Sequence, residues 1–196
     1  MLEEMLVVME MKARDNEMVT AWDRHFHNEQ DVHVVKNEFA RFMHEYDVEC
    51  VVSPANSFGL MDGGYDHAII KHFGEKLKDA VQSYIISEYN GEQPVGTSFI
   101  TTIPGTSGKL IHTPTMRTPS KIKDPMVVYW CMRTCLLLAE KHDVNSIVIP
   151  AFGKGCGELD PEIIALMQKR AYDMLKETPR KIDWSWVDGH TWWEEY

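Results

Sequence analysis

The sequence predicts an α/β protein, built as a three-layer α/β/α sandwich with helices on both faces of a central sheet. Strand-like and helix-like segments alternate along most of the chain, as expected when helices connect the strands of one sheet. Two of these units share one design, in which an apolar strand is followed by a glycine-bearing loop and a helix. A length of 196 residues with 44% hydrophobic residues allows one sizeable core, and no linker or low-complexity run divides the chain.

The order of the elements follows from apolar periodicity and from the breaks between periodic segments. Strands are expected near 4–11, 32–36, 49–53, 96–103, 109–113 and 145–150, and helices near 17–27, 66–88, 124–142 and 161–177. Residues 1–31 are expected to add an edge strand and a flanking helix to a core of about 32–177. The apolar face of that first helix is formed by Met18, Ala21, Trp22 and Phe26.

The first strand–loop–helix unit runs from Val51 to Ile70. Its apolar strand ends in a polar loop that passes through Gly63 and Gly64 directly into a helix. A helix that begins in this way presents free backbone N–H groups and the positive end of its dipole, which together suit a phosphate or pyrophosphate. The apolar face of the helix is formed by Ile69, Ile70, Phe73 and Leu77.

The second unit begins at Ser146. Residues 146–151 form an apolar strand, residues 152–157 form a loop with three alternate glycines, and a helical pattern starts at Pro161, which suits a first helical turn. In α/β sheets, ligands bind beyond the carboxyl ends of the strands, where both loops are expected to emerge. We therefore expect the two loops to face each other across one anionic ligand.

Neither loop matches the common nucleotide-binding motifs. A P-loop requires glycine where this chain has Val148, and serine or threonine where it has Gly155. The dinucleotide fingerprint fails as well, because Glu158 occupies the place of its third glycine. Both the P-loop and the Rossmann interpretations are therefore excluded.

The motifs that remain resemble those of the macro domain family, whose members bind ADP-ribose and its derivatives on an α/β/α sandwich. The family's first loop has Asn-Ala-Ala-Asn and then a glycine cluster before Val-Asp and Ala-Ile. In this chain, residues 53–56 (Ser-Pro-Ala-Asn) and 63–69 (Gly-Gly-Tyr-Asp-His-Ala-Ile) occupy those places. The end of the middle strand and the second phosphate loop are matched by residues 110–113 and 150–157. The resemblance spans about 32–177 and implies a mixed central sheet.

The resemblance also implies roles for individual residues. Asn56 corresponds to the asparagine near the distal ribose, and Glu38 falls where an acid recognises the adenine amino group. Asp66 is a candidate base or water-positioning group, so Asn56 and Asp66 are the candidate catalytic residues. The residues expected to bind the ligand are Glu38, Phe39, Ala55, Asn56, Gly63, Gly64, Tyr65, Gly153, Lys154, Gly155, Cys156 and Gly157.

These residues also have structural alternatives. Glycines after strands often serve only as turn formers, and the side chain of Asn56 is able to stabilise a turn. Asp66 fits the first turn of a helix as an acid favoured by the helix dipole. Cys156 is either a nucleophile activated by loop amides and Lys154, or a small residue that lets the backbone approach the ligand. Arg117 is either a phosphate clamp or a solvated loop charge.

Three departures from the family's pattern bear on the function. Ser53 replaces the first motif asparagine, Asp62 lies where many members have glycine, and Lys154 replaces threonine. The leading hypothesis is an ADP-ribosyl hydrolase or ADP-ribose 1''-phosphate phosphatase, acting on ADP-ribosylated protein or a related derivative. One alternative is a module that binds ADP-ribose without turnover, which needs no accurately placed water and base. Another is a structural protein that has kept the fold and lost the ligand.

Composition restricts the partners and the location. The formal net charge of −10 argues against a surface that follows nucleic-acid phosphates, so anion binding must be local. No apolar segment is long enough to span a membrane and the N-terminus lacks a basic secretory flank, so we expect a cytoplasmic protein with reduced cysteines. His25 and His27 lack acid or cysteine partners in a metal pattern, and His112 fits an interior position at a strand end. We expect neither a metal nor a cofactor.

The C-terminal tail, residues 178–196, carries four of the six tryptophans. We expect it either to dock on the domain or to present an aromatic patch to a partner or a second copy. Neither end of the chain adds a second domain, so residues 1–196 are expected to form one.

Overall fold

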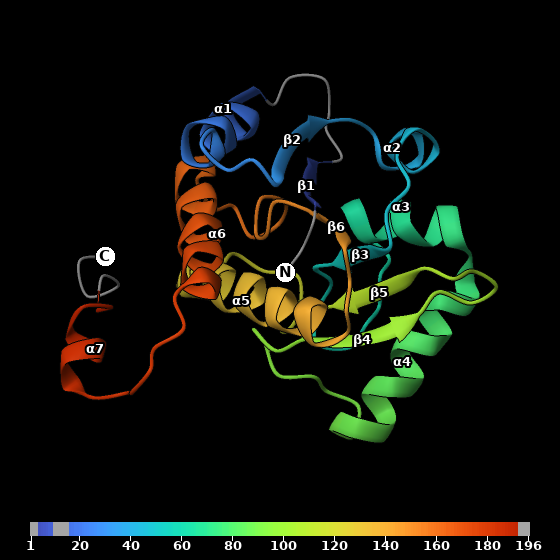
Figure 1. The fold of residues 1–196 in the computed structure, drawn as a ribbon. Coiled ribbons are helices and arrows are strands. Elements are labelled where there is room, and N and C mark those ends of the chain that lie inside the picture. The colour runs from blue at the N-terminus through green and yellow to red at the C-terminus, as the bar shows by residue number, and fades with distance from the viewer. Residues whose placement is uncertain (1–3, 10–15, 192–196) are drawn as a thin grey trace.

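The computed structural model describes residues 4–9 and 16–191, which form six strands and seven helices (Figure 1). Residues 10 and 11, which are predicted from the sequence to belong to the first strand, lie outside the described residues. The strands are β1 (Glu4–Met9), β2 (Val32–Lys36), β3 (Cys50–Ser53), β4 (Phe99–Thr102), β5 (Lys109–His112) and β6 (Ser146–Ile149). The helices are α1 (Asn16–Phe26), α2 (Phe39–Glu45), α3 (Gly64–Phe73), α4 (Glu75–Tyr89), α5 (Met126–Lys141), α6 (Pro161–Lys176) and α7 (Trp184–Asp188).

The strands form one mixed sheet with the order β2-β1-β6-β3-β5-β4. β4 runs antiparallel to β5, and the other pairs are parallel, so the predicted mixed sheet is confirmed. The prediction that the N-terminal strand lies at an edge is wrong, because β1 pairs with β2 on one side and β6 on the other. Parallel neighbours need a crossover, and α1 provides it between β1 and β2, which places β2 at the edge.

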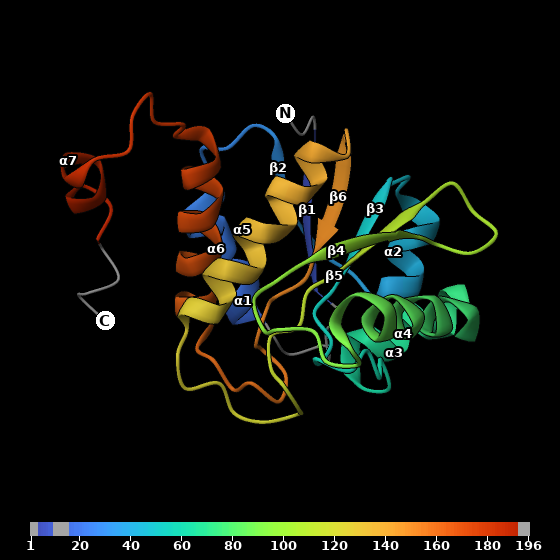
Figure 2. The ribbon, with the colours of Figure 1, turned by 90° about the horizontal axis from the view of Figure 1, so that it is seen from below.

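Helices cover both faces of the sheet, with α1, α5 and α6 on one face and α2, α3 and α4 on the other (Figure 2). The alternation of side chains along β3 explains the two layers. Cys50 and Val52 pack in the core under α1, α5 and α6, whereas Val51 packs with α2, α3 and α4. Burial on both faces accounts for the continuous apolar run in this strand, and the predicted three-layer sandwich is confirmed.

Two helical regions differ from the prediction. The helix expected over 66–88 is divided into α3 and α4 at Gly74, whose φ of +90° lies outside the helical region. The apolar pattern continues across the break because Ile69 and Leu77 face the same core. The prediction omits α2, a helix of seven residues in which Phe39 and Phe42 are buried.

The C-terminal tail follows α6 and lies apart from the sheet. In Figures 1 and 2, α7 lies beyond α6 on the side away from the sheet. Trp184 is 78% exposed, and a contact of 2.9 Å between His190 Nε2 and a carboxylate oxygen of Glu177 ties the tail to the end of α6. Trp192 and Trp193 lie outside the described residues. Among the helices that the structure describes, none is long and apolar enough to cross a membrane, and the cytoplasmic location stays a prediction.

Candidate functional site

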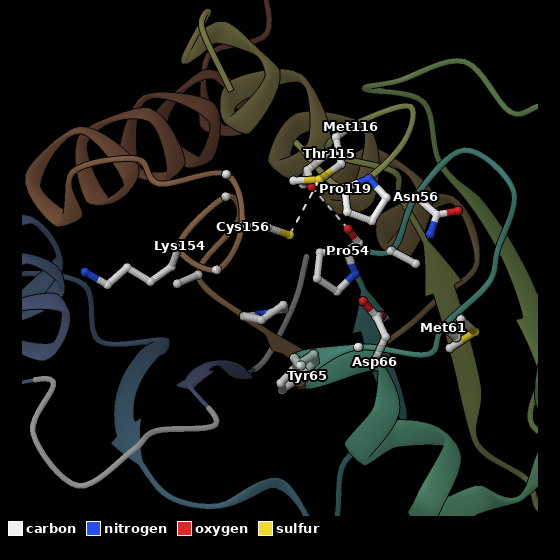
Figure 3. A pocket seen from close by; sticks show the side chains of 18 of the residues that line it. Pro54, Asn56, Met61, Tyr65, Asp66, Thr115, Met116, Pro119, Lys154 and Cys156 are labelled. Carbon is white, nitrogen blue, oxygen red and sulfur yellow. Dashed lines mark hydrogen bonds between the residues drawn. The ribbon is translucent and has the colours of Figure 1, made fainter. Parts of the chain in front are cut away.

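A pocket of about 760 Å³ lies at the carboxyl edge of the sheet (Figure 3). The strands β6, β3 and β5 are adjacent and parallel, so the loops that follow them emerge side by side. This is the edge at which α/β sheets bind ligands. The lining residues come from 54–66, 115–119 and 150–157, together with Glu38 at the start of α2.

The pocket brings together the candidate residues of both glycine loops. Asp66 lines it together with Glu38, Ala55, Asn56, Gly63, Gly64, Tyr65, Gly153, Lys154, Gly155, Cys156 and Gly157. Phe39 does not line it, because its ring is fully buried and meets the Tyr65 ring edge-on at a centroid distance of 5.3 Å. An aromatic ring gains more from burial than its polar neighbour Glu38 does, so Phe39 turns inward and supports Tyr65 from the core.

The first loop delivers the chain into α3 through two glycines. Gly64 has a φ of +52°, in the left-handed region that favours glycine. Gly63 is the N-cap residue, and no side chain caps the first-turn N–H groups from that position. The positive end of the α3 dipole therefore lies at two glycines that line the pocket, where it favours an anion.

Asn56 holds the shape of the first loop. Its Oδ1 accepts a hydrogen bond from the backbone N–H of Phe58 at 3.0 Å, and its backbone pairs with Met116 in an isolated bridge. Asn56 is only 6% exposed although it lines the pocket. Asn56 therefore stabilises the turn in this structure, as one of the two interpretations predicted, and a contact with a ligand would be a second role of the same residue.

Asp66 stands in the first turn of α3 with a defined partner behind it. The hydroxyl of Ser53, at the end of β3, donates a hydrogen bond of 2.6 Å to Asp66 Oδ1. In Figure 3 the carboxylate of Asp66 rises from the start of α3 toward Pro54. The arrangement places an oriented acceptor on the pocket wall, as expected for a group that directs a water molecule.

The glycines of the second loop serve two different purposes. A Cβ at Gly157 would lie 2.6 Å from the carbonyl oxygen of Gly153, so the loop closes on itself only without a side chain there. Gly153 has a φ of +80°, and a Cβ there would approach Leu159 to 2.8 Å. A Cβ at Gly155 would meet no atom within 4 Å, so Gly155 presents bare backbone to the open pocket. This backbone is accessible to a phosphate.

A third wall of the pocket was not expected from the sequence. Thr115, Met116 and Pro119 follow β5 and line the pocket between the two glycine loops. The Thr115 hydroxyl donates to the carbonyl oxygen of Pro54 at 3.2 Å, which fixes this wall to the first loop. The only sequence signal for it is that the segment follows a strand expected beside the others.

Arg117, which lies in this segment, is not among the lining residues. It forms a bidentate pair with Glu92, with N–O distances of 2.7 and 3.0 Å, and its guanidinium lies 5.1 Å from the centre of the Phe58 ring. The hydrogen bond from Arg117 lowers the pKa of Glu92 below its ordinary value. Arg117 therefore stabilises the loop and is not positioned as a phosphate clamp.

Lys154 and Cys156 project from the second loop in different ways. In Figure 3 the side chain of Lys154 extends away from Pro54 and Asp66. Cys156 is exposed, and its Sγ lies 3.9 Å from Met116 Sδ. A thioether does not remove a proton from a thiol, so this contact favours the interpretation of Cys156 as a small residue of the loop.

Two of the histidines outside the pocket, His112 and His25, have structural partners. His112 on β5 is fully buried with Nδ1 2.6 Å from Gln93 Oε1, and burial lowers the pKa of His112 to about 3. His25 Nε2 lies 2.8 Å from a carboxylate oxygen of Glu162. In residues 4–9 and 16–191 there is no group of three or more His, Cys, Asp or Glu that could hold a metal ion.

Comparison with known proteins agrees with this fold and pocket. The macro domain model matches residues 52–167, and the chain belongs to the macro domain family. An uncharacterized protein of Aquifex aeolicus is 35% identical over 141 residues, which cover 69% of this chain and 76% of that protein. The O-acetyl-ADP-ribose deacetylase of Salmonella gallinarum is 33% identical over 114 residues, covering 57% of this chain and 62% of the enzyme. The chain is also similar to the solved structure of an Oceanobacillus iheyensis macrodomain with ADP, with 25% sequence identity and a TM-score of 0.52. The match covers 62% of this chain and 68% of that one.

Proposed function

We propose that this protein binds ADP-ribose or an ADP-ribose derivative in the pocket and hydrolyses the bond between the distal ribose and its substituent. The observation that carries the proposal is one pocket formed by two glycine loops, with the Asp66 carboxylate on its wall. The similarity to a macrodomain solved with ADP supports the nucleotide part of the proposal. The similarity to the O-acetyl-ADP-ribose deacetylase supports the hydrolytic part.

Binding would rest on local backbone contacts, because the chain as a whole carries a net charge of −10. The amides at the start of α3 and around Gly155 would hold the diphosphate between the two loops. Glu38 would accept a hydrogen bond from the adenine amino group at the start of α2. The distal ribose would then lie near Asn56, beside Asp66.

Hydrolysis needs one water molecule and one base. The water would attack the carbon or phosphorus atom at which the bond breaks, and Asp66 would accept a proton from the water. The electron pair of the broken bond and a proton go to the group that leaves, so the products are ADP-ribose and the free substituent. Holding water and substrate together in the pocket supplies much of the rate through proximity.

A module that binds without turnover is the second candidate. One observation favours it: the Oδ1 of Asn56 is already engaged by the N–H of Phe58, so this oxygen is committed to the loop. The replacement of family residues by Ser53, Asp62 and Lys154 also fits a site selected for affinity alone.

Time-resolved chromatography separates the two candidates. The wild-type protein and Asp66→Asn are incubated with O-acetyl-ADP-ribose, ADP-ribose 1''-phosphate and a mono-ADP-ribosylated protein. Release of ADP-ribose from any of these by the wild type, and its loss in Asp66→Asn, is the result expected for the hydrolase. Saturable binding without release from any substrate would show the binding module. Absence of binding at millimolar ADP-ribose would favour a structural protein that has lost the ligand.

A further inference from the structure

Ser53 is a polar residue at the end of an otherwise apolar strand. It is fully buried, and the alternation along β3 places its side chain on the same face as Val51, toward α3. A buried hydroxyl costs free energy unless it has a hydrogen-bond partner. The partner is Asp66, so one hydrogen bond joins the end of β3 to the first turn of α3 across the loop that lines the pocket.

The chemistry of the two groups determines which of them donates the hydrogen bond. An ionised carboxylate only accepts hydrogen bonds, so the Ser53 hydroxyl is the donor. Its length of 2.6 Å is in the range of charge-assisted O–H···O⁻ bonds, which are stronger than neutral ones. The terminal torsion of an aspartate side chain is broad, and a bond to one oxygen restricts the rotation of the carboxylate.

Ser53 and Asp66 stand in different relations to a ligand. Asp66 lines the pocket, whereas Ser53 is buried behind it and is not part of the lining. A ligand in the pocket therefore meets the carboxylate and not the hydroxyl. Any effect of Ser53 on the reaction must pass through Asp66.

We propose that Ser53 is a positioning residue, which holds the Asp66 carboxylate in the orientation that directs the attacking water. This assignment rests on the proposed function, because it gives Ser53 a part in the hydrolytic step that Asp66 serves. Since Ser53 has no contact with the pocket, removing its hydroxyl lowers the rate of the chemical step and leaves ligand affinity unchanged.

The test compares Ser53→Ala with two other variants. Ser57→Ala is the matched control, because Ser57 is also buried, lies in the loop that follows Ser53 and does not line the pocket. Ser53→Thr keeps the hydroxyl and tests rescue. Each variant is assayed with the substrate that the wild type hydrolyses, its ADP-ribose Kd is measured by calorimetry, and kcat is normalised to the fraction of protein that binds ADP-ribose.

Ser53→Ala is expected to lower kcat about ten- to a hundredfold with KM and Kd within about threefold of the wild type, because only the orienting bond is lost. Ser57→Ala is expected to behave as the wild type, and Ser53→Thr to recover most of the rate.

Four results would overturn the assignment. Wild-type kcat in Ser53→Ala, with Asp66→Asn inactive, would refute the positioning role and leave the proposed function intact. A loss of affinity equal to the loss of rate in Ser53→Ala would show a structural role instead. Wild-type turnover in Asp66→Asn would refute the role of Asp66 in the reaction and the assignment with it. No turnover by the wild type would refute the proposed hydrolytic function, and the assignment would fail for that reason.

Discussion

Replacing Gly155 with valine is expected to weaken ADP-ribose binding strongly and to leave the fold intact. A Cβ at position 155 meets no atom within 4 Å, and the residue is not among the glycines with positive φ, so a branched side chain fits the loop. The added carbons would instead occupy the pocket, where a phosphate oxygen must approach the backbone N–H groups to about 2.9 Å. Losing one such bond to a charged group costs about 1.5–3 kcal/mol, which raises Kd about ten- to a hundredfold.

Gly157→Ala is the contrasting control in the same loop. Its Cβ would lie 2.6 Å from the carbonyl oxygen of Gly153, so we expect the free energy of unfolding to fall by about 1–3 kcal/mol. Calorimetry with ADP-ribose and thermal denaturation are measured on both variants. Wild-type affinity in Gly155→Val, or a loss of stability as large as that of Gly157→Ala, would refute the reasoning.

Three further outcomes are expected. Asp66→Asn is expected to keep its ADP-ribose Kd within a few fold and to lower the single-turnover rate by about a hundredfold or more; equal losses would identify Asp66 as a binding group. Asn56→Ala removes the acceptor for the N–H of Phe58, so we expect the free energy of unfolding to fall by about 1–3 kcal/mol and the melting temperature to fall with it. The ADP-ribose affinity is expected to fall as well. An unchanged melting curve would contradict this prediction. Burial lowers the pKa of His112 from 6.5 to about 3, so between these pH values the unfolded chain binds a proton that the folded protein does not. Stability is therefore expected to fall as pH drops through this window, by up to about 1.4 kcal/mol per pH unit, and less steeply in His112→Gln. Urea denaturation at several pH values checks this, and equal slopes in the two proteins would exclude His112 as the cause.

The two glycine loops could be predicted because their signals are local. Each loop follows an apolar strand and precedes a helix within a short stretch of sequence, and strands in one parallel sheet place such loops at one edge. Gly155 and Gly157 look alike in the sequence, however. Only the structure shows that one faces the pocket and the other closes the loop.

The remaining features depend on contacts between distant segments. The third wall at 115–119 carries no glycine pattern, and it reaches the pocket because β5 pairs with β3. Arg117 could not be assigned because its partner Glu92 lies in a different segment. Helical periodicity runs across Gly74, so the break between α3 and α4 depends on a backbone angle that periodicity does not reveal.

The most direct test of the central claim is a calorimetric titration of the wild-type protein with ADP-ribose, compared with AMP, ADP and NAD. A pocket that holds adenine, diphosphate and distal ribose together predicts saturable binding of ADP-ribose, tighter than that of the three other nucleotides. No detectable binding at millimolar ADP-ribose, or equal affinity for AMP and ADP-ribose, would contradict the claim that the two glycine loops form an ADP-ribose site.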